Sequence, residues 1–386
     1  MGKKFLATTC SYLIKKRSRN VISNEVRLTL QKNNLKSALR RGRDLTESIR
    51  NLPDDSLLCL AMCLTELRAL KPYPGWHFDI AEAHSSSTTQ SRRLIWNICH
   101  ERRLQKPILH PWYHDSTINL YLGNDLSRPI YVGGCIEPNE FAFVHALLKE
   151  DMVMLDIGAN DGLFSVLAAL QVGKQGRVLS FEPSPRELAR LQANICLNDL
   201  GNVTIFAQAV TDQMGSAQLR ISEYGHEGQN TLGNFVWNVR QTGTQTVETC
   251  CLDQVPEVRN LHRLDLMKID VEGAEHKVLK GAKEVIQKFK PALLLELLDK
   301  ALQFQGSSEC QLIQHLLDLG YRIYDFSETS GQPALSNFKK HSTNIVAVYH
   351  PCLRIGKNVQ SNQQLLDAIR PICKEKNNEE RVDPPL

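Results

Sequence analysis

The sequence feature that most constrains the fold is the stretch Met152–Gly162, which reads MVMLDIGANDG. An apolar run ends in Asp156 and turns into a loop that carries Gly158 and Gly162, and apolar residues at helical spacing follow. This order predicts a strand, a glycine turn and the start of a helix, the opening unit of an open α/β sheet. Glycines let a backbone approach a ligand closely, and the helix N-terminus offers free N–H groups.

A second apolar run, Val178–Phe181, ends in Glu182 and Pro183. An acidic side chain at the tip of the second strand of such a sheet can accept hydrogen bonds from both hydroxyls of a ribose. The two stretches together predict a site for a nucleoside cofactor.

The glycine pattern indicates which nucleoside cofactor fits. A dinucleotide site favours G-x-G-x-x-G, whereas the loop Gly158–Gly162 reads GANDG and lacks the second glycine. Asp156, directly before the loop, suits a cationic or amino-acid ligand better than a diphosphate. S-adenosylmethionine has an amino-acid end, a sulfonium and a ribose but no phosphates, so the loop favours this cofactor over NAD.

The α/β pattern continues after the second run. Ser184–Glu187 has the signature of a helix start, with serine at the cap and proline at the first helical position. The polar, Gly-rich stretch 215–251 interrupts the pattern, and such an insertion is a natural place for substrate contacts. Apolar runs predict strands at 203–207, 266–271, 291–298, 321–326 and 344–349, and helices at 278–289 and 312–319.

Residues 1–127 precede this pattern and are predicted to form a mainly helical region of unknown role, with helical spacing over 20–70 and 91–103. Met1–Arg50 contains 13 Lys+Arg and 3 Asp+Glu, a local charge of +10, so the rest of the chain carries −6 of the net +4. A basic helix could contact a membrane surface or an acidic partner, or it could be a solvated face. The acidic remainder argues against a nucleic-acid groove around the main site.

The stretch that joins this region to the sheet is rich in aromatic and histidine side chains. Pro107–Asp115, PILHPWYHD, is interpreted as a loop that could line a substrate pocket or pack against the next domain. Residues 119–121 and Pro129–Val132 are predicted as short strands, and Asn139 as the N-cap of a helix that runs to Leu148. The four loop side chains that could reach a pocket are His110, Trp112, Tyr113 and His114.

Cysteine usage and hydropathy suggest a cellular location. The 11 cysteines show no CxxC pairs, which is typical of reduced thiols in a cytoplasm. No window reaches the roughly 18 consecutive apolar residues of a membrane helix. The basic run Lys15–Arg17 stands where a signal peptide would have its cleavage site. We therefore expect a cytoplasmic protein without a transmembrane segment, with a C-terminal tail, 351–386, that is partly disordered.

Four stretches resemble the FkbM family of class I methyltransferases: Asp156–Ser165, Phe181–Pro185, Lys268–Gly281 and Pro291–Glu296. The resemblance covers about Ile130–Tyr349. It implies a Rossmann-like sheet with helices on both faces, in a domain that we place at 128–350. It also implies O-methylation of a hydroxyl on a sugar, glycolipid or natural product, with S-adenosylmethionine as donor.

The resemblance also implies which residues bind the cofactor. Glu182 would hold the ribose, and Ala159 and Pro183 complete the predicted contacts. The methionine part would be held by Asp156, Gly158, Asn160 and Gly162.

Methyl transfer to a hydroxyl requires in-line placement and a group that takes the proton. Asp270, Glu272 and Glu296 follow the fourth and fifth strands and should face one crevice at the carboxyl ends of the sheet. We predict that Asp270 or Glu272 is the base or the anchor of the substrate hydroxyl. His276 is a weaker candidate, more simply a surface histidine, and Glu275 is most simply a helix-dipole residue.

The same three carboxylates could instead hold Mg²⁺, which prefers oxygen ligands. Without a histidine pattern or a fixed ligand spacing, the sequence predicts no metal. Two other functions stay open: a non-catalytic binding protein that keeps the fold, and an NAD-dependent oxidoreductase, which the missing glycine disfavours. A protein or nucleic-acid methyltransferase is a variant of the main hypothesis, and the basic N-terminal segment is the only feature in its favour.

Overall fold

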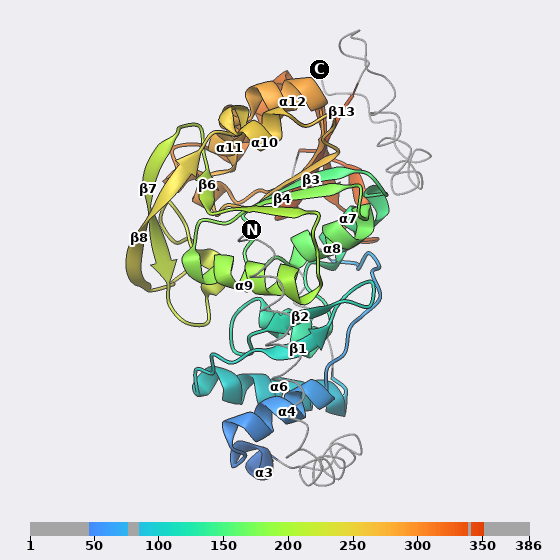
Figure 1. The fold of residues 1–386 in the computed structure, drawn as a ribbon, viewed down its shortest axis with the longest axis vertical. Coiled ribbons are helices and arrows are strands. Elements are labelled where there is room, and N and C mark those ends of the chain that lie inside the picture. The colour runs from blue at the N-terminus through green and yellow to red at the C-terminus, as the bar shows by residue number, and fades with distance from the viewer. Residues whose placement is uncertain (1–45, 76–84, 339–340, 351–386) are drawn as a thin grey trace, which may run out of the picture.

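The computed structural model describes residues 46–75, 85–338 and 341–350. Its central element is an eight-stranded mixed sheet (Figure 1). Five neighbouring strands of this sheet are parallel to one another, and the remaining three strands pair antiparallel. The order is β5 (Val203–Phe206), β4 (Arg177–Phe181), β3 (Val153–Ile157), β9 (Leu266–Ile269), β10 (Ala292–Glu296), β13 (Asn344–Tyr349), β11 (Tyr321–Phe326) and β12 (Pro333–Leu335).

Strand order reverses at β3, which pairs with β4 on one side and with β9 on the other. In an open α/β sheet, such a reversal leaves a crevice beyond the carboxyl ends of the strands, where ligands bind. All five residues of β3 are buried, because helices cover both faces of the sheet. The predicted fold class is therefore confirmed.

Side chains alternate along the strands and build one hydrophobic cluster on each face. Met154 belongs to the cluster that includes side chains of α7 (Pro138–Leu147), α8 (Leu163–Val172) and α9 (Pro185–Leu197). Leu155 belongs to the cluster on the opposite face. The helices of that second cluster are α10 (Pro256–Arg259), α11 (Glu275–Gly281), α12 (Lys283–Phe289), α13 (Asp299–Phe304) and α14 (Glu309–Asp318).

The N-terminal region packs on the side of α8 and shares its hydrophobic cluster (Figure 1). Ser86 caps α6 by accepting a hydrogen bond from the Thr89 N–H, so the Ser- and Thr-rich run starts a helix. The elements of this region are α3 (Thr46–Arg50), α4 (Asp54–Cys63), α6 (Ser87–Glu101), the hairpin β1 (Ile108–Pro111) and β2 (Thr117–Leu120), and the π-helix η1 (Pro129–Gly133).

In the structure the insertion begins earlier than predicted, at β6 (Gln208–Val210), and forms a separate three-stranded sheet in which β8 (Gln241–Cys250) lies between β6 and β7 (Gly215–Ser222). Both β7 and β8 lie within the stretch 215–251. Between β7 and β8 the chain forms the short helix η2 (Glu227–Gln229), and η3 (Leu252–Gln254) follows β8.

Three local predictions are wrong, each for a backbone reason. Pro129–Val132 forms a π-helix instead of a strand; Pro129 occupies its first turn and Gly134 ends it in the left-handed region at φ 84°. Asn139 does not cap α7, because Pro138 takes the first helical position and Glu137 becomes the cap. The Asn139 side chain instead accepts a hydrogen bond from the Tyr73 N–H at 2.6 Å.

The helix predicted at 278–289 is two helices, α11 and α12, and the break follows Gly281. A Cβ at Gly281 would stand 2.0 Å from the carbonyl oxygen of Thr211, so the chain passes the insertion too closely for a side chain. Among the described residues, no helix has the length and apolar character needed to cross a bilayer. The helical spacing expected before residue 46 and the disorder expected after 350 lie outside the described residues.

Candidate active site

A cavity of about 290 Å³ lies at the strand reversal, beyond the carboxyl ends of β3, β4, β9 and β10. The loop Gly158–Asp161 and Glu182 line one part of it, and Asp270–Glu272 with Glu296 line another. The chain before β3 contributes Asp125, Leu126, Ile136 and Glu137, and the insertion contributes Glu227, Gly228, Gln229 and Asn230. Three parts of the chain that are far apart in sequence therefore build one cavity.

The glycine loop is held against both neighbouring strands. The N–H groups of Gly158 and Ala159 both donate to the carbonyl of Phe181, at 3.0 Å each. Gly158 has φ 78°, and a Cβ there would stand 1.8 Å from the carbonyl oxygen of Asp270. Glycine at this position is thus required by both the backbone conformation and the close approach of the loop to the end of β9.

Glu182 joins the two sequence motifs. Its Oε2 accepts a hydrogen bond from the Asn160 N–H at 2.9 Å, and its Oε1 accepts one from the Ser184 N–H at 2.8 Å. Burial raises the pKa of Glu182 to about 8. Each carboxylate oxygen has a further lone pair, so the side chain can still accept hydrogen bonds from a ligand in the cavity.

Two of the seven predicted cofactor residues stand behind the cavity wall. Asp156 is fully buried, does not line the cavity, and accepts a hydrogen bond from the Ser165 hydroxyl at 2.5 Å. Gly162 caps α8 at φ 83°, where a Cβ would meet Leu191 at 2.4 Å. The predicted cofactor residues that do line the cavity are Gly158, Ala159, Asn160, Glu182 and Pro183.

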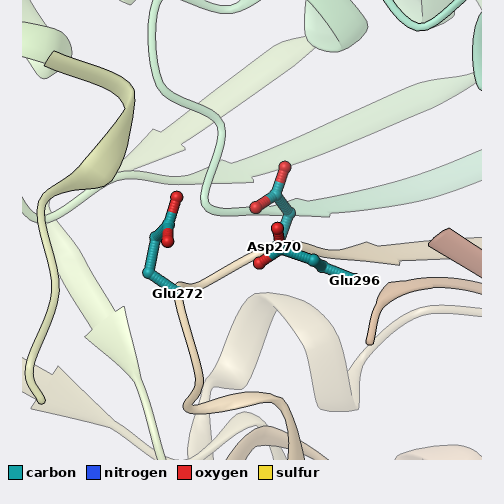
Figure 2. A group of neighbouring side chains, drawn as sticks. All are labelled: Asp270, Glu272 and Glu296. Atoms are coloured by element: carbon teal, nitrogen blue, oxygen red, sulfur yellow. The ribbon is translucent and has the colours of Figure 1, made fainter. Parts of the chain in front are cut away.

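The three predicted catalytic carboxylates are brought together (Figure 2). Asp270, Glu272 and Glu296 each offer an oxygen, and these oxygens lie within 4.8 Å of one another. Burial raises the pKa of Glu272 and of Glu296 well above the ordinary value for a glutamate. Repulsion from Asp270 adds to this shift at Glu272, and repulsion from Glu272 adds to it at Glu296.

Lys268 is the counter-charge of this group. Its Nζ lies 2.9 Å from Oδ2 of Asp270 and 4.9 Å from the ring centroid of Phe164. Burial alone would lower the pKa of Lys268, but Asp270, Asp156 and Glu137 outweigh it and raise the pKa, so the ammonium stays charged. Three carboxylates at this spacing could also hold a divalent cation, and the lysine beside Asp270 would compete with it.

Sequence reasoning missed Glu137 as a site residue. It lines the cavity with φ 41°, a left-handed conformation that is uncommon for a glutamate. Asn160 and Glu272, at φ 50° and φ 53°, share this conformation and also line the cavity. Residues held in this region cluster at functional sites. No local sequence pattern marks Glu137 as a residue of the cavity wall.

Other candidates lie outside the cavity wall. Glu275 stands at the start of α11, where its Oε1 accepts hydrogen bonds from the N–H groups of Val271 and Gly273, at 3.1 and 3.0 Å. His276 is buried and contacts Ser307, so its interpretation as a surface histidine was wrong.

The aromatic stretch before the sheet is a packing element. It contains β1 and does not form a loop throughout. Trp112 and Tyr113 are buried against Phe141, with ring centroids 5.5 and 6.0 Å away. His110, Trp112, Tyr113 and His114 do not line the cavity.

Comparison with known proteins places this site in a family. Residues 156–323 match the methyltransferase FkbM domain. The chain is 33% identical over 186 residues to the 2-O-methyltransferase NoeI of Sinorhizobium fredii, covering 45% of this chain and 74% of that protein. It is 29% identical over 198 residues to the methyltransferase sdnD of Sordaria araneosa, covering 42% and 75%.

A third relative is the hexuronic acid methyltransferase AglP of Haloferax volcanii, 27% identical over 139 residues, covering 36% of this chain and 53% of that protein. The matched range begins at Asp156 in β3 and ends at Ile323 in β11, and it contains the glycine loop, Glu182 and the three carboxylates. The chain therefore belongs to the FkbM methyltransferase family and is a methyltransferase.

Proposed function

We propose that this enzyme uses S-adenosylmethionine to methylate a hydroxyl group of a small acceptor, such as a sugar, glycolipid or natural product. The observation that carries the proposal is the junction of the glycine loop with Glu182 in one cavity at the strand reversal. The relative NoeI, named a 2-O-methyltransferase, supports methyl transfer to a hydroxyl oxygen, and the relative AglP, named a hexuronic acid methyltransferase, supports a sugar-like acceptor.

The cavity residues would divide the cofactor between them. Glu182 would accept hydrogen bonds from the ribose hydroxyls, with Pro183 beside it. Gly158, Ala159 and Asn160 would face the amino-acid end, where the close packing of Gly158 against Asp270 fixes the loop. Asp156 would act from behind, since its Oδ2 holds Ser165 in the first turn of α8.

The reaction asks two things of the carboxylates. When bound, S-adenosylmethionine supplies a methyl group activated by a sulfonium. Asp270 or Glu272 would orient the acceptor hydroxyl in line with that methyl group and take the hydroxyl proton as the new C–O bond forms. Glu296 would complete the anchor for the acceptor, and Lys268 would hold Asp270 in place through their 2.9 Å ion pair.

The charge of the cavity disfavours the variant in which the acceptor is a nucleic acid. Its wall carries carboxyl groups from several distant segments, among them Asp125, Glu227 and Glu296, and their ionised forms would repel a phosphate backbone. We also place the enzyme in the cytoplasm, because none of the described cysteines forms a disulfide.

Calorimetric titration with S-adenosylmethionine and S-adenosylhomocysteine tests the cofactor assignment. We expect both to bind, and Glu182→Ala to weaken binding by about 1–3 kcal/mol, the cost of losing hydrogen bonds to a charged group. Glu150→Ala is the matched control, because Glu150 is exposed and outside the cavity. Equal affinities of the wild type and Glu182→Ala would remove Glu182 from the cofactor site.

A further inference from the structure

We propose that the acceptor carries no anionic group beside its methylated hydroxyl and is bound best when it presents an ammonium group, as an amino sugar does. The inference rests on the proposed function, because it concerns the part of the same cavity that the cofactor does not use. The inference depends on which charged groups line that part of the cavity and on which of them already have hydrogen-bond or ion-pair partners.

Acidic side chains reach the cavity from six separate segments besides the glycine loop and the end of β4. They are Asp125 after β2, Glu137 before α7, Glu187 in α9, Glu227 in η2, Glu272 after β9 and Glu296 at the end of β10. The side chains are therefore collected by the tertiary structure and are not one acidic run of the sequence. Any group that enters the cavity beyond the cofactor meets carboxyl groups on several sides.

Positive charge on the wall is nearly absent. Among the described residues that line the cavity, Lys268 is the only lysine or arginine. Its ammonium is already engaged, 2.9 Å from Asp270, and its other charged neighbours include Asp156 and Glu137. This lysine also shows that an ammonium group fits among these carboxylates.

The acids differ in how their oxygens are used. Asp125 accepts hydrogen bonds from the N–H groups of Leu126 and Gly228, and Glu227 accepts one from the Gly225 N–H, so these two also hold the surrounding loops. Glu296 has no such role: its Oε2 is shielded from solvent and has no hydrogen-bond partner within the described part of the chain. In Figure 2 its carboxylate lies beside that of Asp270.

A ligand that donates a charged hydrogen bond to the carboxyl groups lining the cavity gains more than a neutral donor would. An ammonium group can make up to three such bonds. A carboxylate or phosphate on the acceptor would be repelled by the ionised forms of these acids, in a cavity where water screens charge poorly. The wall thus selects by attraction for one class of acceptor and by repulsion against another.

The ionisation of the wall agrees with this geometry. Burial and the neighbouring Glu227 raise the pKa of Asp125 to about 7, and burial with Glu140 and Asp270 raises the pKa of Glu137 to about 8. Without a cation nearby, these groups hold protons near neutral pH. A bound ammonium group would favour their ionised forms.

Two of these acids lie outside the family domain. Asp125 and Glu137 precede residue 156, where the match to the FkbM domain begins. The charge selection that we propose is therefore set partly by residues outside the range matched to the FkbM domain. It would distinguish the enzyme from the relative AglP, whose name assigns it a hexuronic acid, an anionic class of acceptor.

Three methyl glucosides that differ only at carbon 6 test the proposal: methyl 6-amino-6-deoxyglucoside, methyl glucoside and methyl glucuronide. Methyl transfer is measured as S-adenosylhomocysteine release, and binding is measured by competition or thermal shift in the presence of S-adenosylhomocysteine. We expect kcat/KM or affinity to fall in that order, with the amine favoured over the neutral sugar by about tenfold, the scale of one charge-assisted hydrogen bond. A glucuronide that equals or exceeds the neutral sugar overturns the proposal, as does equal behaviour of all three, including no detectable binding.

Glu137→Gln and Glu150→Gln form a matched pair for the structural origin of the preference. Glu137 lines the cavity and Glu150 is exposed, so only the first substitution should reduce the preference for the amine, by severalfold, with the KM for S-adenosylmethionine unchanged. An unchanged preference in Glu137→Gln would show that this carboxylate does not contact the acceptor.

The same series with EDTA and with added Mg²⁺ separates an ammonium from a metal as the source of positive charge. Discrimination that persists in EDTA supports the ammonium. A glucuronide that becomes the best acceptor only with Mg²⁺ overturns it and assigns the charge to the metal. Titration with S-adenosylmethionine distinguishes failure of the proposed function from failure of this inference. Absence of cofactor binding would contradict the proposed function, whereas cofactor binding together with a preference for the glucuronide would contradict only the inference about the acceptor.

Discussion

The two parts of the cavity differ in how they are built. The cofactor part comes from one short range, Gly158–Pro183, and its polar groups are tied down by backbone hydrogen bonds, above all those that Asn160 and Ser184 donate to Glu182. The acceptor part collects carboxyl groups from distant segments, and Glu296 has a buried oxygen without a partner. The cofactor part is thus held rigid before any ligand binds, whereas the acceptor part has this buried oxygen still unpaired among the described residues. This difference suits a cofactor that binds in one fixed position and an acceptor that supplies the missing partner.

The largest expected effect concerns the acceptor part. Asp270→Asn should lower kcat by about 10²–10⁴, the usual contribution of a positioned acid or base, and should leave S-adenosylmethionine affinity nearly unchanged. Single-turnover rates and calorimetry measure the two quantities separately. Since Lys268 would lose its ion-pair partner, unfolding curves must show that the variant is folded. A variant with wild-type turnover would remove Asp270 from the reaction.

The next effect concerns the rigidity of the cofactor part. Gly158→Ala should destabilise the protein by about 3–5 kcal/mol, because its Cβ would stand 1.8 Å from the Asp270 carbonyl oxygen and φ is 78°. Gly201→Ala is the control, since nothing lies within 4 Å of a Cβ there. Denaturant unfolding measures both. A loss below about 1 kcal/mol at Gly158 would mean that the loop is not held tightly.

A smaller effect links Glu182 to pH. Burial raises its pKa to about 8, well above the ordinary value of 4.5 for a glutamate. The folded state therefore keeps a proton that the unfolded state releases, and the stability from this group is lost as pH rises from about 4.5 to about 8. We expect the melting temperature of the ligand-free enzyme to decline over this range, and to decline less in Glu182→Gln. Parallel curves for the two proteins would contradict a buried, proton-holding Glu182.

The smallest expected effect is that of metal removal. Because the Lys268 ammonium already lies 2.9 Å from Asp270, dialysis against EDTA should leave methyl transfer unchanged. Assays with and without added Mg²⁺ measure this directly. A large, reversible loss of activity in EDTA would instead make Asp270, Glu272 and Glu296 metal ligands.

The same contrast explains what the sequence could predict. The cofactor part is local, so its strands, its glycine turn and the approach of Glu182 to the loop follow from apolar runs and spacing alone. Asp156 shows the limit of that reasoning: it stands directly before the loop, yet its side chain turns to Ser165 and away from the cavity. Alternation along a strand does not reveal which helix packs on which face.

In the acceptor part, only the residues that follow strands of the main sheet could be predicted from the sequence. Asp270, Glu272 and Glu296 end adjacent strands, so their meeting follows from strand order. Asp125 and Glu137 reach the cavity through the packing of the N-terminal region on α8, which no local pattern encodes. The break at Gly281 is similar, because it depends on the insertion passing close to α11.

The most direct test of the central claim is a crystal structure of the enzyme with S-adenosylhomocysteine. We predict that the ribose hydroxyls lie within hydrogen-bond distance of Glu182 and that the sulfur faces the group formed by Asp270, Glu272 and Glu296. A ligand bound elsewhere, or with its ribose away from Glu182, would contradict the account.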